Sequence, residues 1–478
     1  MEQKFLLSPF LQAIPDPASD KAMVYHALYG NPLVVNGEAL RFLETFREPK
    51  TVAEAAELCD GDPTETVRKF ASVHFLVEPE IDEKHHLHRQ KAQHLLKVSA
   101  KQTIDRMGLA ISDNCNFGCP HCLHFQPVNG KVLPIYDGSR SQLSMSWETA
   151  KKCIDQVIAL TRSNGQTNLK ISFGNAEPLL NWPVIQKVLL YCNTFPDMTF
   201  QFAINTNLVL MTKEIAEYFK RYQVDISTSL DGNEQANNAI RITKGGKGTF
   251  QRIVEKFDLL AEIGYPLDGF SITVTSGNFH LIDTDIVDLA AEREMVNIAF
   301  DYDLIGLVNV SVSERVEKLM RLKKYANSRG IDFFGTWDTP FRNLTSGSLL
   351  TDSQFFCAAV EGRSLEFNVD GSIKVCNHTT TRVGHVDNLN VIFHRGGGLF
   401  KMVEDRFPGT DEYCGDCMIE GPCGGQCHVT REVVSRSIGE KRQRIFSDMC
   451  DFYRTVTKAL TLEYLQSNET IILGNQQE

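Results

Sequence analysis

The grouping of the cysteines constrains the fold of this 478-residue chain more than any other feature of its sequence. Of the thirteen cysteines, Cys115, Cys119 and Cys122 are spaced CX3CX2C, and seven more lie between residues 357 and 450. Thiols clustered at short spacings are typical of metal or iron–sulfur sites, because reducing compartments rarely keep disulfides. The other three fall on the apolar faces of helical patterns, and we expect them in the core: Cys59, Cys153 and Cys192.

Charge and hydropathy exclude several classes of partner. The formal net charge is −11, which disfavours a nucleic-acid backbone as the main partner. No apolar run approaches membrane-spanning length, and the N-terminus lacks the basic start and long apolar core of a signal peptide. We therefore expect a cytoplasmic protein with no nucleic-acid and no membrane partner.

Five segments are expected along the chain. Residues 1–85 read as strand, strand, helix, helix, helix, strand, which is a winged-helix-like order. A charged, His-rich stretch at 86–104 is predicted to be a linker or a solvated helix. Strand and helix patterns alternate over 105–345, a Cys-rich and Gly-rich region covers 346–455, and 456–478 forms a C-terminal tail. We expect metal sites to hold the Cys-rich region more than a core does.

The central region predicts an α/β fold with a parallel sheet. Strand and helix alternate about six times, which indicates crossover helices and either a partial barrel or an open sheet. Function in such folds gathers at the carboxyl ends of the strands. The CX3CX2C loop directly follows the first strand, so we expect it at that mouth. The predicted strands are 106–111, 169–173, 200–204, 225–230, 270–275 and 296–304.

The three-cysteine loop lacks a fourth ligand. Zinc sites of the cysteine type usually combine two CX2C-like knuckles, and this loop has no partner knuckle. His121 and His124 are the nearest substitutes, but His121 lies between Pro120 and Cys122, which resists binding to the same ion. Three thiolates on one compact loop suit a 4Fe–4S cube in which one iron stays open.

Several segments together resemble the radical SAM enzymes, whose signature is CX3CX2C after the first strand of a (β/α)6 partial barrel. The segment "ISFGNAEPLLNW" resembles a degenerate GGEP motif that keeps Glu177 and Pro178. "INTNLVL" is similar to the segment after the third strand, although Leu208 stands where glycine is common. "STSLDG" resembles the family's segment after the fourth strand, and "RITKGGKGTF" matches a pattern of the peptide-modifying branch.

The resemblance implies that S-adenosylmethionine (SAM) supplies the missing ligand. Its amino and carboxylate groups chelate the open iron, and a low-potential cluster reduces the sulfonium to give a 5′-deoxyadenosyl radical. The backbone at 175–178 would hold the methionyl amine, and an arginine would suit the carboxylate or ribose. His121 stands where an aromatic that packs on adenine is common. The implied SAM contacts are Asn175, Ala176, Glu177, Asn205, Ser229 and Arg241.

The seven later cysteines resemble those of the SPASM domain, which carries two auxiliary 4Fe–4S clusters. "CGDCMIEGPCGGQC" is CX2CX5CX3C, a GX4C ends upstream at Cys376, and Cys450 lies downstream. The alternative is a zinc ribbon. By resemblance, the nearer cluster takes Cys357, Cys376 and Cys427, and the farther one takes Cys414, Cys417, Cys423 and Cys450.

Two auxiliary cubes need eight ligands, and seven cysteines are present. We therefore predict an open iron in the nearer cluster, filled by a side chain such as His378, by water or, as we favour, by a substrate sulfur. In all, the resemblance implies three clusters, SAM and a one-electron reductant such as flavodoxin or ferredoxin.

The predicted function is a maturase that installs a radical-derived bond, a thioether or a carbon–carbon crosslink, in a ribosomally made peptide. Residues 1–85 would bind the leader peptide as an added strand. A DNA-binding winged helix is disfavoured, because residues 1–90 carry 9 Lys and Arg against 15 Asp and Glu, whereas a purely structural cap stays possible. Two alternatives for the whole chain are a non-catalytic electron carrier and a sulfatase-maturase-like enzyme. The second is disfavoured, because Asn377 replaces the Asp that follows the GX4C cysteine in the sulfatase maturases.

Overall fold

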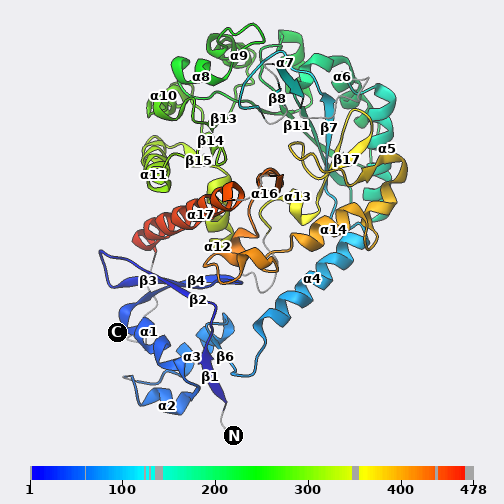
Figure 1. Cartoon of the computed structure of the whole chain (residues 1–478). Coiled ribbons are helices and arrows are strands. Elements are labelled where there is room, and N and C mark those ends of the chain that lie inside the picture. The colour runs from blue at the N-terminus through cyan, green and yellow to red at the C-terminus, as the bar shows by residue number, and fades with distance from the viewer. Residues whose placement is uncertain are drawn as a thin grey trace.

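Three parts of the chain are arranged around the open side of a barrel (Figure 1). The computed structural model describes residues 3–59, 61–122, 125–128, 131–134, 144–346, 355–436 and 440–468. An N-terminal unit lies at the bottom of Figure 1 and a ring of strands and helices at the top. The Cys-rich segments lie between them, within the open side of the ring.

The N-terminal unit contains two small antiparallel sheets and three helices. From β3 onward the predicted strand–strand–helix–helix–helix–strand order is interrupted by the two-residue strand β5, and two further strands that the sequence patterns did not predict precede it. Asn36 and Thr51 cap the first two helices with their side chains. One sheet has the strand order β2 (Leu11–Pro15), β3 (Lys21–His26) and β4 (Gly30–Asn36). The other has the order β5 (Lys50–Thr51), β1 (Lys4–Leu7) and β6 (Leu76–Val77). The helices are α1 (Gly37–Glu44), α2 (Val52–Ala56) and α3 (Thr64–Ser72).

The barrel contains the predicted six strand–helix units, as an α/β fold with parallel pairing. One sheet has the order β12-β11-β10-β7 and another the order β13-β14-β15, and a single parallel bridge, Ser229 to Ser271, joins them. The strands are β7 (Arg106–Ser112), β10 (Asn168–Asn175), β11 (Thr199–Asn205), β12 (Asp225–Ser227), β13 (Gly269–Val274), β14 (Asn297–Tyr302) and β15 (Asp332–Phe334). The helices are α5 (Trp147–Ser163), α6 (Trp182–Cys192), α7 (Lys213–Arg221), α8 (Glu234–Ile240), α9 (Phe250–Glu262), α10 (Asp285–Glu292), α11 (Val312–Ser328) and α12 (Thr339–Thr345).

Side-chain alternation gives the barrel sheet two different faces. Alternate residues of β7, such as Met107 and Leu109, are fully buried with the apolar side chains of the surrounding helices. The other face carries small or polar residues, and Gln201 and Asn205 on β11 are exposed there. We call this second face the inner face. Cys153 and Cys192 are buried in the core as predicted, whereas Cys59 lies beyond the end of α2 and is half-buried.

The Cys-rich region is joined to the barrel by main-chain pairing. Strand β16 (Ser364–Phe367) pairs parallel with β7, and β17 (Ser372–Lys374) and β18 (Gly384–His385) continue the sheet antiparallel. Val360, Phe367 and Ile373 are fully buried in the same core as the barrel. The region therefore contributes to a buried core in addition to carrying its cysteines. Its helices are α13 (Ala358–Glu361), α14 (Gly398–Asp405), α15 (Glu420–Cys423) and α16 (His428–Arg436).

Two long helices occupy the segments that were predicted to be a linker or solvated helix and a C-terminal tail. Residues 86–99 of the expected linker belong to helix α4 (Glu83–Ser99). The described part of the expected tail forms the end of helix α17 (Glu440–Ser467). The apolar residues Val456 and Leu460 of α17 are buried, and Leu465 packs against Tyr25 of the N-terminal sheet. None of the described helices is long and apolar enough to cross a membrane.

The remaining elements are short. Strands β8 (Phe125–Val128) and β9 (Lys131–Pro134) form an antiparallel hairpin after the first cysteine loop. Turns of 3-10 helix occur at η1 (Thr45–Arg47), η2 (Pro178–Asn181), η3 (Phe279–Leu281), η4 (Thr336–Asp338), η5 (Val386–Phe393) and η6 (Glu412–Cys414).

Candidate active site

The CX3CX2C loop lies at the carboxyl end of β7, as predicted, and two other segments fix it there. Cys115 and Cys119 are buried, and Cys122 is half-buried. The Gly118 N–H donates to the Ile242 carbonyl at 2.8 Å, within the "RITKGGKGTF" segment. A Cβ at Gly118 would lie 3.3 Å from the Lys244 Cα, so this glycine permits the close approach. The pattern after the fourth strand therefore forms one wall of the cysteine loop.

The sulfurs of this loop are surrounded by N–H donors. The Phe117 N–H donates to the Cys115 Sγ at 3.4 Å, and the Asn207 side-chain amide lies 3.8 Å from the same sulfur. Burial, together with the nearby Glu177, Cys119 and Cys122, raises the pKa of the Cys115 thiol to about 12. A thiolate in this position needs a bound cation to offset its desolvation, and N–H donors to sulfur are typical of iron–sulfur ligands.

The degenerate GGEP motif forms a bulge beside the loop. The pairing register of β7 and β10 shifts at Asn175, whose φ is +86°, a left-handed value that asparagine tolerates better than most residues. The N–H groups of Ala176 and Glu177 then donate to the carbonyls of Ser112 and Asn114 at 3.2 and 3.0 Å. The motif is thus held against the segment that leads into the first cysteine.

The Glu177 carboxylate is used entirely within the protein. It is fully buried and accepts hydrogen bonds from the N–H groups of Leu179 and Asn207 and from the Thr206 hydroxyl, at 2.8–2.9 Å. Burial raises its pKa to about 7, although these hydrogen bonds oppose that shift. The carboxylate therefore ties the motif to the turn after β11, and the backbone of residues 175–178 remains the predicted SAM contact.

The turn after β11 places Asn207 against the cysteine loop. Asn205, the predicted contact, ends β11 on its exposed inner face. Asn207 is buried, and its amide donates to the Asn116 side chain at 2.7 Å. Leu208 has a φ of +62°, the left-handed region that glycine adopts without strain. This conformation explains why glycine suits the position in the family that the segment resembles.

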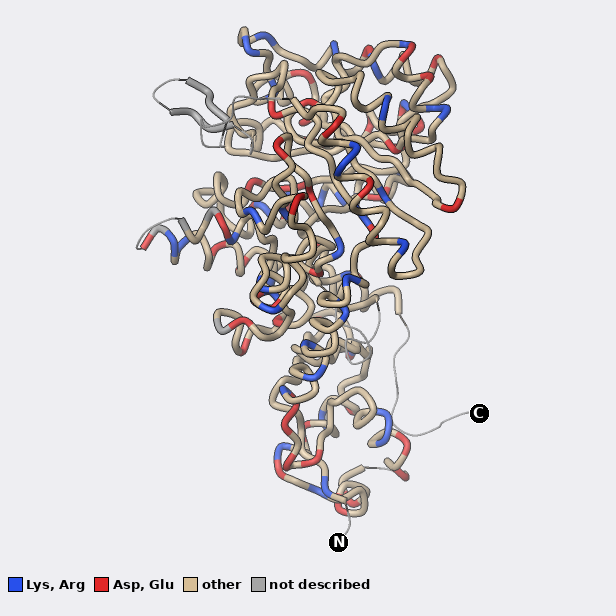
Figure 2. Tube along the Cα trace, turned by 90° about the vertical axis from the view of Figure 1, so that its right-hand side faces the viewer, with Lys and Arg blue, Asp and Glu red and all other residues tan. Residues whose placement is uncertain are grey.

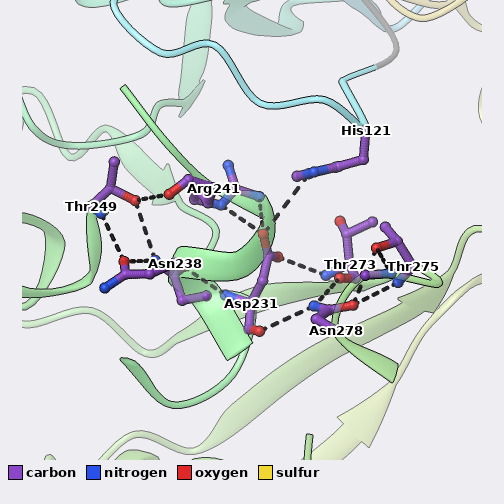
Figure 3. Close-up of polar contacts among 10 residues, drawn as sticks. His121, Asp231, Asn238, Arg241, Thr249, Thr273, Thr275 and Asn278 are labelled. Atoms are coloured by element: carbon purple, nitrogen blue, oxygen red, sulfur yellow. Dashed lines mark hydrogen bonds and ion pairs between the residues drawn. The ribbon is translucent and has the colours of Figure 1, made fainter. Parts of the chain in front are cut away.

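Arg241 and Asp231 form a buried ion pair at the end of β12 (Figure 3). The Asp231 Oδ2 accepts from the Nε and Nη2 of Arg241 at 2.7 Å, and its Oδ1 accepts from the Thr273 N–H at 2.8 Å. His121 points toward the pair from the cysteine loop, with its Nε2 3.9 Å from the Asp231 Oδ2 (Figure 3). Ser229, the other predicted contact here, is half-buried at the bridge to β13. Asp231 thus holds Arg241 beside the cysteines, and His124 lies outside the described residues.

The seven later cysteines separate into two groups in space. We call Cys357, Cys376 and Cys427 the inner group. Burial, together with the nearby Cys427 and Cys357 thiols, raises the pKa of the Cys376 thiol to about 12. We call Cys414, Cys417, Cys423 and Cys450 the outer group. Burial, together with the nearby Cys417 and Cys450 thiols, raises the pKa of the Cys423 thiol to about 12.

Hydrogen bonds position the inner group. The Glu432 carboxylate on α16 accepts from the hydroxyls of Thr379, Thr380 and Thr381 at 2.6–2.8 Å. Burial alone would raise the pKa of Glu432, but these bonds lower it to about 2. Because Thr379 follows Cys376 and α16 follows Cys427, Glu432 joins the two segments that carry these thiols.

The donor sets fit iron–sulfur clusters better than single ions. Among the described residues, no three Cys, His, Asp or Glu side chains converge closely enough to share one ion. A tetrahedral zinc site requires that convergence, whereas the thiolates of a cube bind separate irons. In the outer group, the Gln426 side-chain amide donates to the Cys450 Sγ at 2.9 Å, the kind of contact that tunes a cluster.

Asp301 is an inner-face carboxylate that the sequence patterns did not single out. Its neighbours on β14, Ile298 and Phe300, are fully buried with the helices, so Asp301 faces inward. Its Oδ1 accepts from the N–H and hydroxyl of Thr336 at 2.7 and 2.6 Å. Burial raises its pKa, against the effect of these bonds and of Arg342. A carboxyl of this kind is suited to proton exchange.

A cavity of about 450 Å³ lies at the opposite end of the barrel, where β12 and β13 diverge. Residues that begin strands line it, including Asp225, Gly269 and Asn297. The cavity is therefore distant along the strands from the cysteine loop and does not belong to the candidate active site.

Comparison with known proteins agrees with this geometry. The model of the radical SAM superfamily matches residues 109–292, which run from β7 to the end of α10. Residues 109–292 therefore form a radical SAM domain. The hypothesis of a non-catalytic electron carrier is therefore wrong. Membership implies a 4Fe–4S cluster and SAM, which the CX3CX2C loop and the segments around it are suited to hold.

The enzyme is similar to maturases in sequence and fold. Radical SAM cyclopropyl synthase TigE of Paramaledivibacter caminithermalis is 22% identical over 464 residues, 96% of each chain. The structure of anSMEcpe with bound AdoMet covers 75% of the enzyme and 99% of that chain, at 15% identity and a TM-score of 0.56. SuiB of Streptococcus suis, bound to precursor peptide SuiA, covers 91% of the enzyme and 97% of that chain, at 14% identity and a TM-score of 0.50. The enzyme is thus maturase-like.

Sequence reasoning missed Asn207, Asp301 and Glu432. Asn207 stands two residues after the predicted Asn205, but only the left-handed turn at Leu208 shows which asparagine reaches the loop. The inward position of Asp301 follows from strand alternation in "NIAFDY", and this signal was available. Glu432 has no local signal, because its partners lie about fifty residues upstream.

Proposed function

We propose that the enzyme is a maturase that installs a radical-derived bond in a ribosomally synthesised peptide or small protein. The observation that carries the proposal is the division of ten cysteines into three spatial groups. One group lies at the mouth of the barrel, and the two others lie in the region that closes its open side. This arrangement supports one SAM-binding cluster and two auxiliary clusters.

The proposed cofactor set is three 4Fe–4S clusters, with SAM and a one-electron reductant such as flavodoxin or ferredoxin. Cys115, Cys119 and Cys122 would hold the first cluster. SAM would be bound by the backbone of residues 175–178, with Asn205, Ser229 and Arg241 around it. When bound, this pair supplies a 5′-deoxyadenosyl radical that abstracts a hydrogen atom from the peptide.

A carbon–carbon bond is the favoured product class. TigE, similar over nearly the whole of both chains, is described as a cyclopropyl synthase, and cyclopropane formation joins carbon atoms. A thioether is the second candidate. Mass spectrometry of the modified peptide separates them, because alkylation of cysteine thiols before and after reaction reveals whether a sulfur has been consumed.

A sulfatase-maturase-like reaction is disfavoured by Asn377. That group carries an Asp directly after the GX4C cysteine, where a carboxylate can accept a proton. The Asn377 amide stands there in this enzyme, next to Gly174 at the end of β10. An amide cannot serve as the base, so this position does not support that chemistry.

The inner group supports an open iron. Three cysteines form it, and Cys357 is exposed. His378, two residues after Cys376, water or a substrate sulfur would take the fourth position, and we favour the substrate. Electron paramagnetic resonance of the auxiliary clusters should change on addition of precursor peptide. An unchanged spectrum, with a protein side chain identified on the fourth iron, would refute the open site.

The N-terminal unit is proposed to bind the leader peptide. SuiB, whose structure was determined with a precursor peptide, aligns with 91% of the enzyme, although this likeness concerns the fold alone. Acidic and basic residues are interspersed along the unit, at the bottom of Figure 2, and residues 1–90 carry 15 acidic against 9 basic side chains. A peptide bound through added strand pairing suits this charge balance better than a nucleic acid does.

Deleting the unit is a poor test, because Tyr25 and Val34 pack against Leu344 and Leu465 and truncation would expose that apolar surface. Hydrogen exchange of the intact enzyme with its precursor avoids this problem. We expect new protection at the edge of the β2–β3–β4 sheet. Protection confined to the barrel would contradict the recognition role and favour a structural cap.

Iron content and SAM cleavage test the main proposal. The anaerobically reconstituted enzyme should hold about twelve irons and no stoichiometric zinc. Replacing Cys115, Cys119 and Cys122 by Ala should remove about four irons and all production of 5′-deoxyadenosine, while Cys59→Ser, at a half-buried cysteine outside the groups, should change neither. SAM cleavage retained in the triple variant would refute the proposal.

A further inference from the structure

The turn between Cys423 and Cys427 has an unusual backbone. Its residues Gly424, Gly425 and Gln426 have φ values of +54°, +76° and +69°, so three successive residues are left-handed. Glycine adopts this conformation without strain, and glutamine does not. Because Cys423 belongs to the outer group and Cys427 to the inner group, the turn joins the two groups.

A single buried guanidinium binds this turn. The Nη2 of Arg406 donates to the carbonyls of Gly425 and Gln426 at 2.9 and 2.6 Å, and it approaches the Gly424 carbonyl at 3.5 Å. Its Nη1 lies 3.4 Å from the His428 Nδ1. The side chain is 7% exposed, and its Nε has no hydrogen-bond partner among the described residues. The left-handed turn thus directs its carbonyls at Arg406.

Arg406 binds the turn whose two ends are Cys423 of the outer group and Cys427 of the inner group. Burial lowers the pKa of its guanidinium, and the thiols of Cys427 and Cys357 from the inner group oppose that shift. Cys423 and Cys414 of the outer group act in the same direction. Arg406 therefore lies close enough to both groups for its charge to act on each.

Two other arginines near the outer group differ from Arg406. Arg431 pairs with Asp411. Arg454 pairs with Asp451 at 2.6 Å, and its Nη1 lies 4.0 Å from the Cys417 Sγ of the outer group. A carboxylate partner cancels most of the field that an arginine exerts on a more distant group. In the part of the chain that the structure describes, no carboxylate pairs with Arg406. Backbone carbonyls and the thiols offset its charge.

We propose that Arg406 is a shared positive charge that sets the reduction equilibria of both auxiliary clusters. The inference rests on the proposed function, since it requires clusters at both groups. Reduction adds one electron, and therefore one negative charge, to a cube. A buried cation that cannot lose its proton stabilises the more negative state in a medium of low dielectric constant. Arg406 is thus a positioning residue for the turn and an electrostatic one for the clusters.

Redox titration of the auxiliary clusters tests the proposal. The Cys115→Ala, Cys119→Ala, Cys122→Ala background removes the signal of the first cluster and should keep about eight irons. In this background we expect Arg406→Met and Arg406→Gln to lower the one-electron reduction constant of both clusters at least tenfold, about 59 mV each. Arg406→Lys keeps the charge and should restore most of the shift. Arg162→Met, at an exposed pair with Asp197, is the control and should shift neither cluster.

Each outcome distinguishes the inference from the proposed function. A background protein without about eight irons would show that the proposed function is wrong, and the inference with it. Neutral variants that keep their iron with unchanged potentials, or with a shift in one cluster only, would overturn the inference alone. If both neutral variants lose iron while Arg406→Lys keeps it, the role of Arg406 is structural and the electrostatic proposal is overturned.

Discussion

Leu208 combines two opposing contributions to stability, and replacing it tests how the turn after β11 is held. The side chain is fully buried, so Leu208→Ala should cost about 2–5 kcal/mol in lost packing. The backbone is left-handed, with a φ of +62°, which costs any residue with a Cβ about 1–2 kcal/mol. Leu208→Gly relieves this strain but loses the same packing. The packing loss is larger, so both variants should be less stable than the natural enzyme.

The order of the two variants carries the test. Glycine gains about 1–2 kcal/mol from the relieved strain and loses about 0.5–1 kcal/mol through the entropy of the unfolded chain. Leu208→Gly should therefore be more stable than Leu208→Ala by up to about 1.5 kcal/mol. Leu189 is a matched control, since it is fully buried within helix α6. There Ala should be more stable than Gly by about 1 kcal/mol.

Native-state hydrogen exchange of the turn is the appropriate assay, because it reports local opening without unfolding the whole enzyme. The Met211 N–H, which donates to the Leu208 carbonyl at 2.7 Å, is a suitable probe. It should exchange faster in both variants, and faster with Ala than with Gly. The opposite order at residue 208, matching that at residue 189, would refute the left-handed conformation and the explanation of Asn207's position.

Three other substitutions test the site. Asp231→Asn leaves Arg241 without its counter-charge and should lower the free energy of unfolding by about 3–5 kcal/mol. Calorimetry should also show weaker SAM binding, and unchanged binding would contradict a role for Arg241. In Asp301→Asn, SAM cleavage measured in the absence of peptide should be unchanged, but the rate of peptide modification should fall about a hundredfold or more. A product yield equal to that of the natural enzyme would exclude Asp301 from proton transfer. Because the pKa of Glu432 is lowered to about 2, the order that it gives residues 379–381 should be complete above about pH 4.5 and lost as the pH falls toward 2. In Glu432→Gln, hydrogen exchange in this segment should be faster at neutral pH and lose that pH dependence.

Much of the fold could be read from local patterns. Strand–helix alternation predicted six barrel units but not the seventh strand, β15. This signal depends on neighbours within a few residues. Strands β1, β2 and β5 were missed, and the segment of helix α4 was predicted to be a linker or a solvated helix because its charged side chains conceal a weak apolar periodicity. Helix α17 was not predicted, since the burial of Leu465 depends on an N-terminal sheet more than 400 residues away.

The sequence by itself determined the chemistry of this enzyme, and the tertiary structure decided how that chemistry is supported. Cysteine spacing is a local property, so CX3CX2C identified the first loop, and the later spacings predicted an inner and an outer group, within which the thiols of Cys376 and Cys423 interact electrostatically with others of their own group. Asp231 beneath Arg241 and Arg406 between the two later groups have no such signature. Their roles depend on burial and on which charges lie nearby, and only the packing of distant segments fixes both.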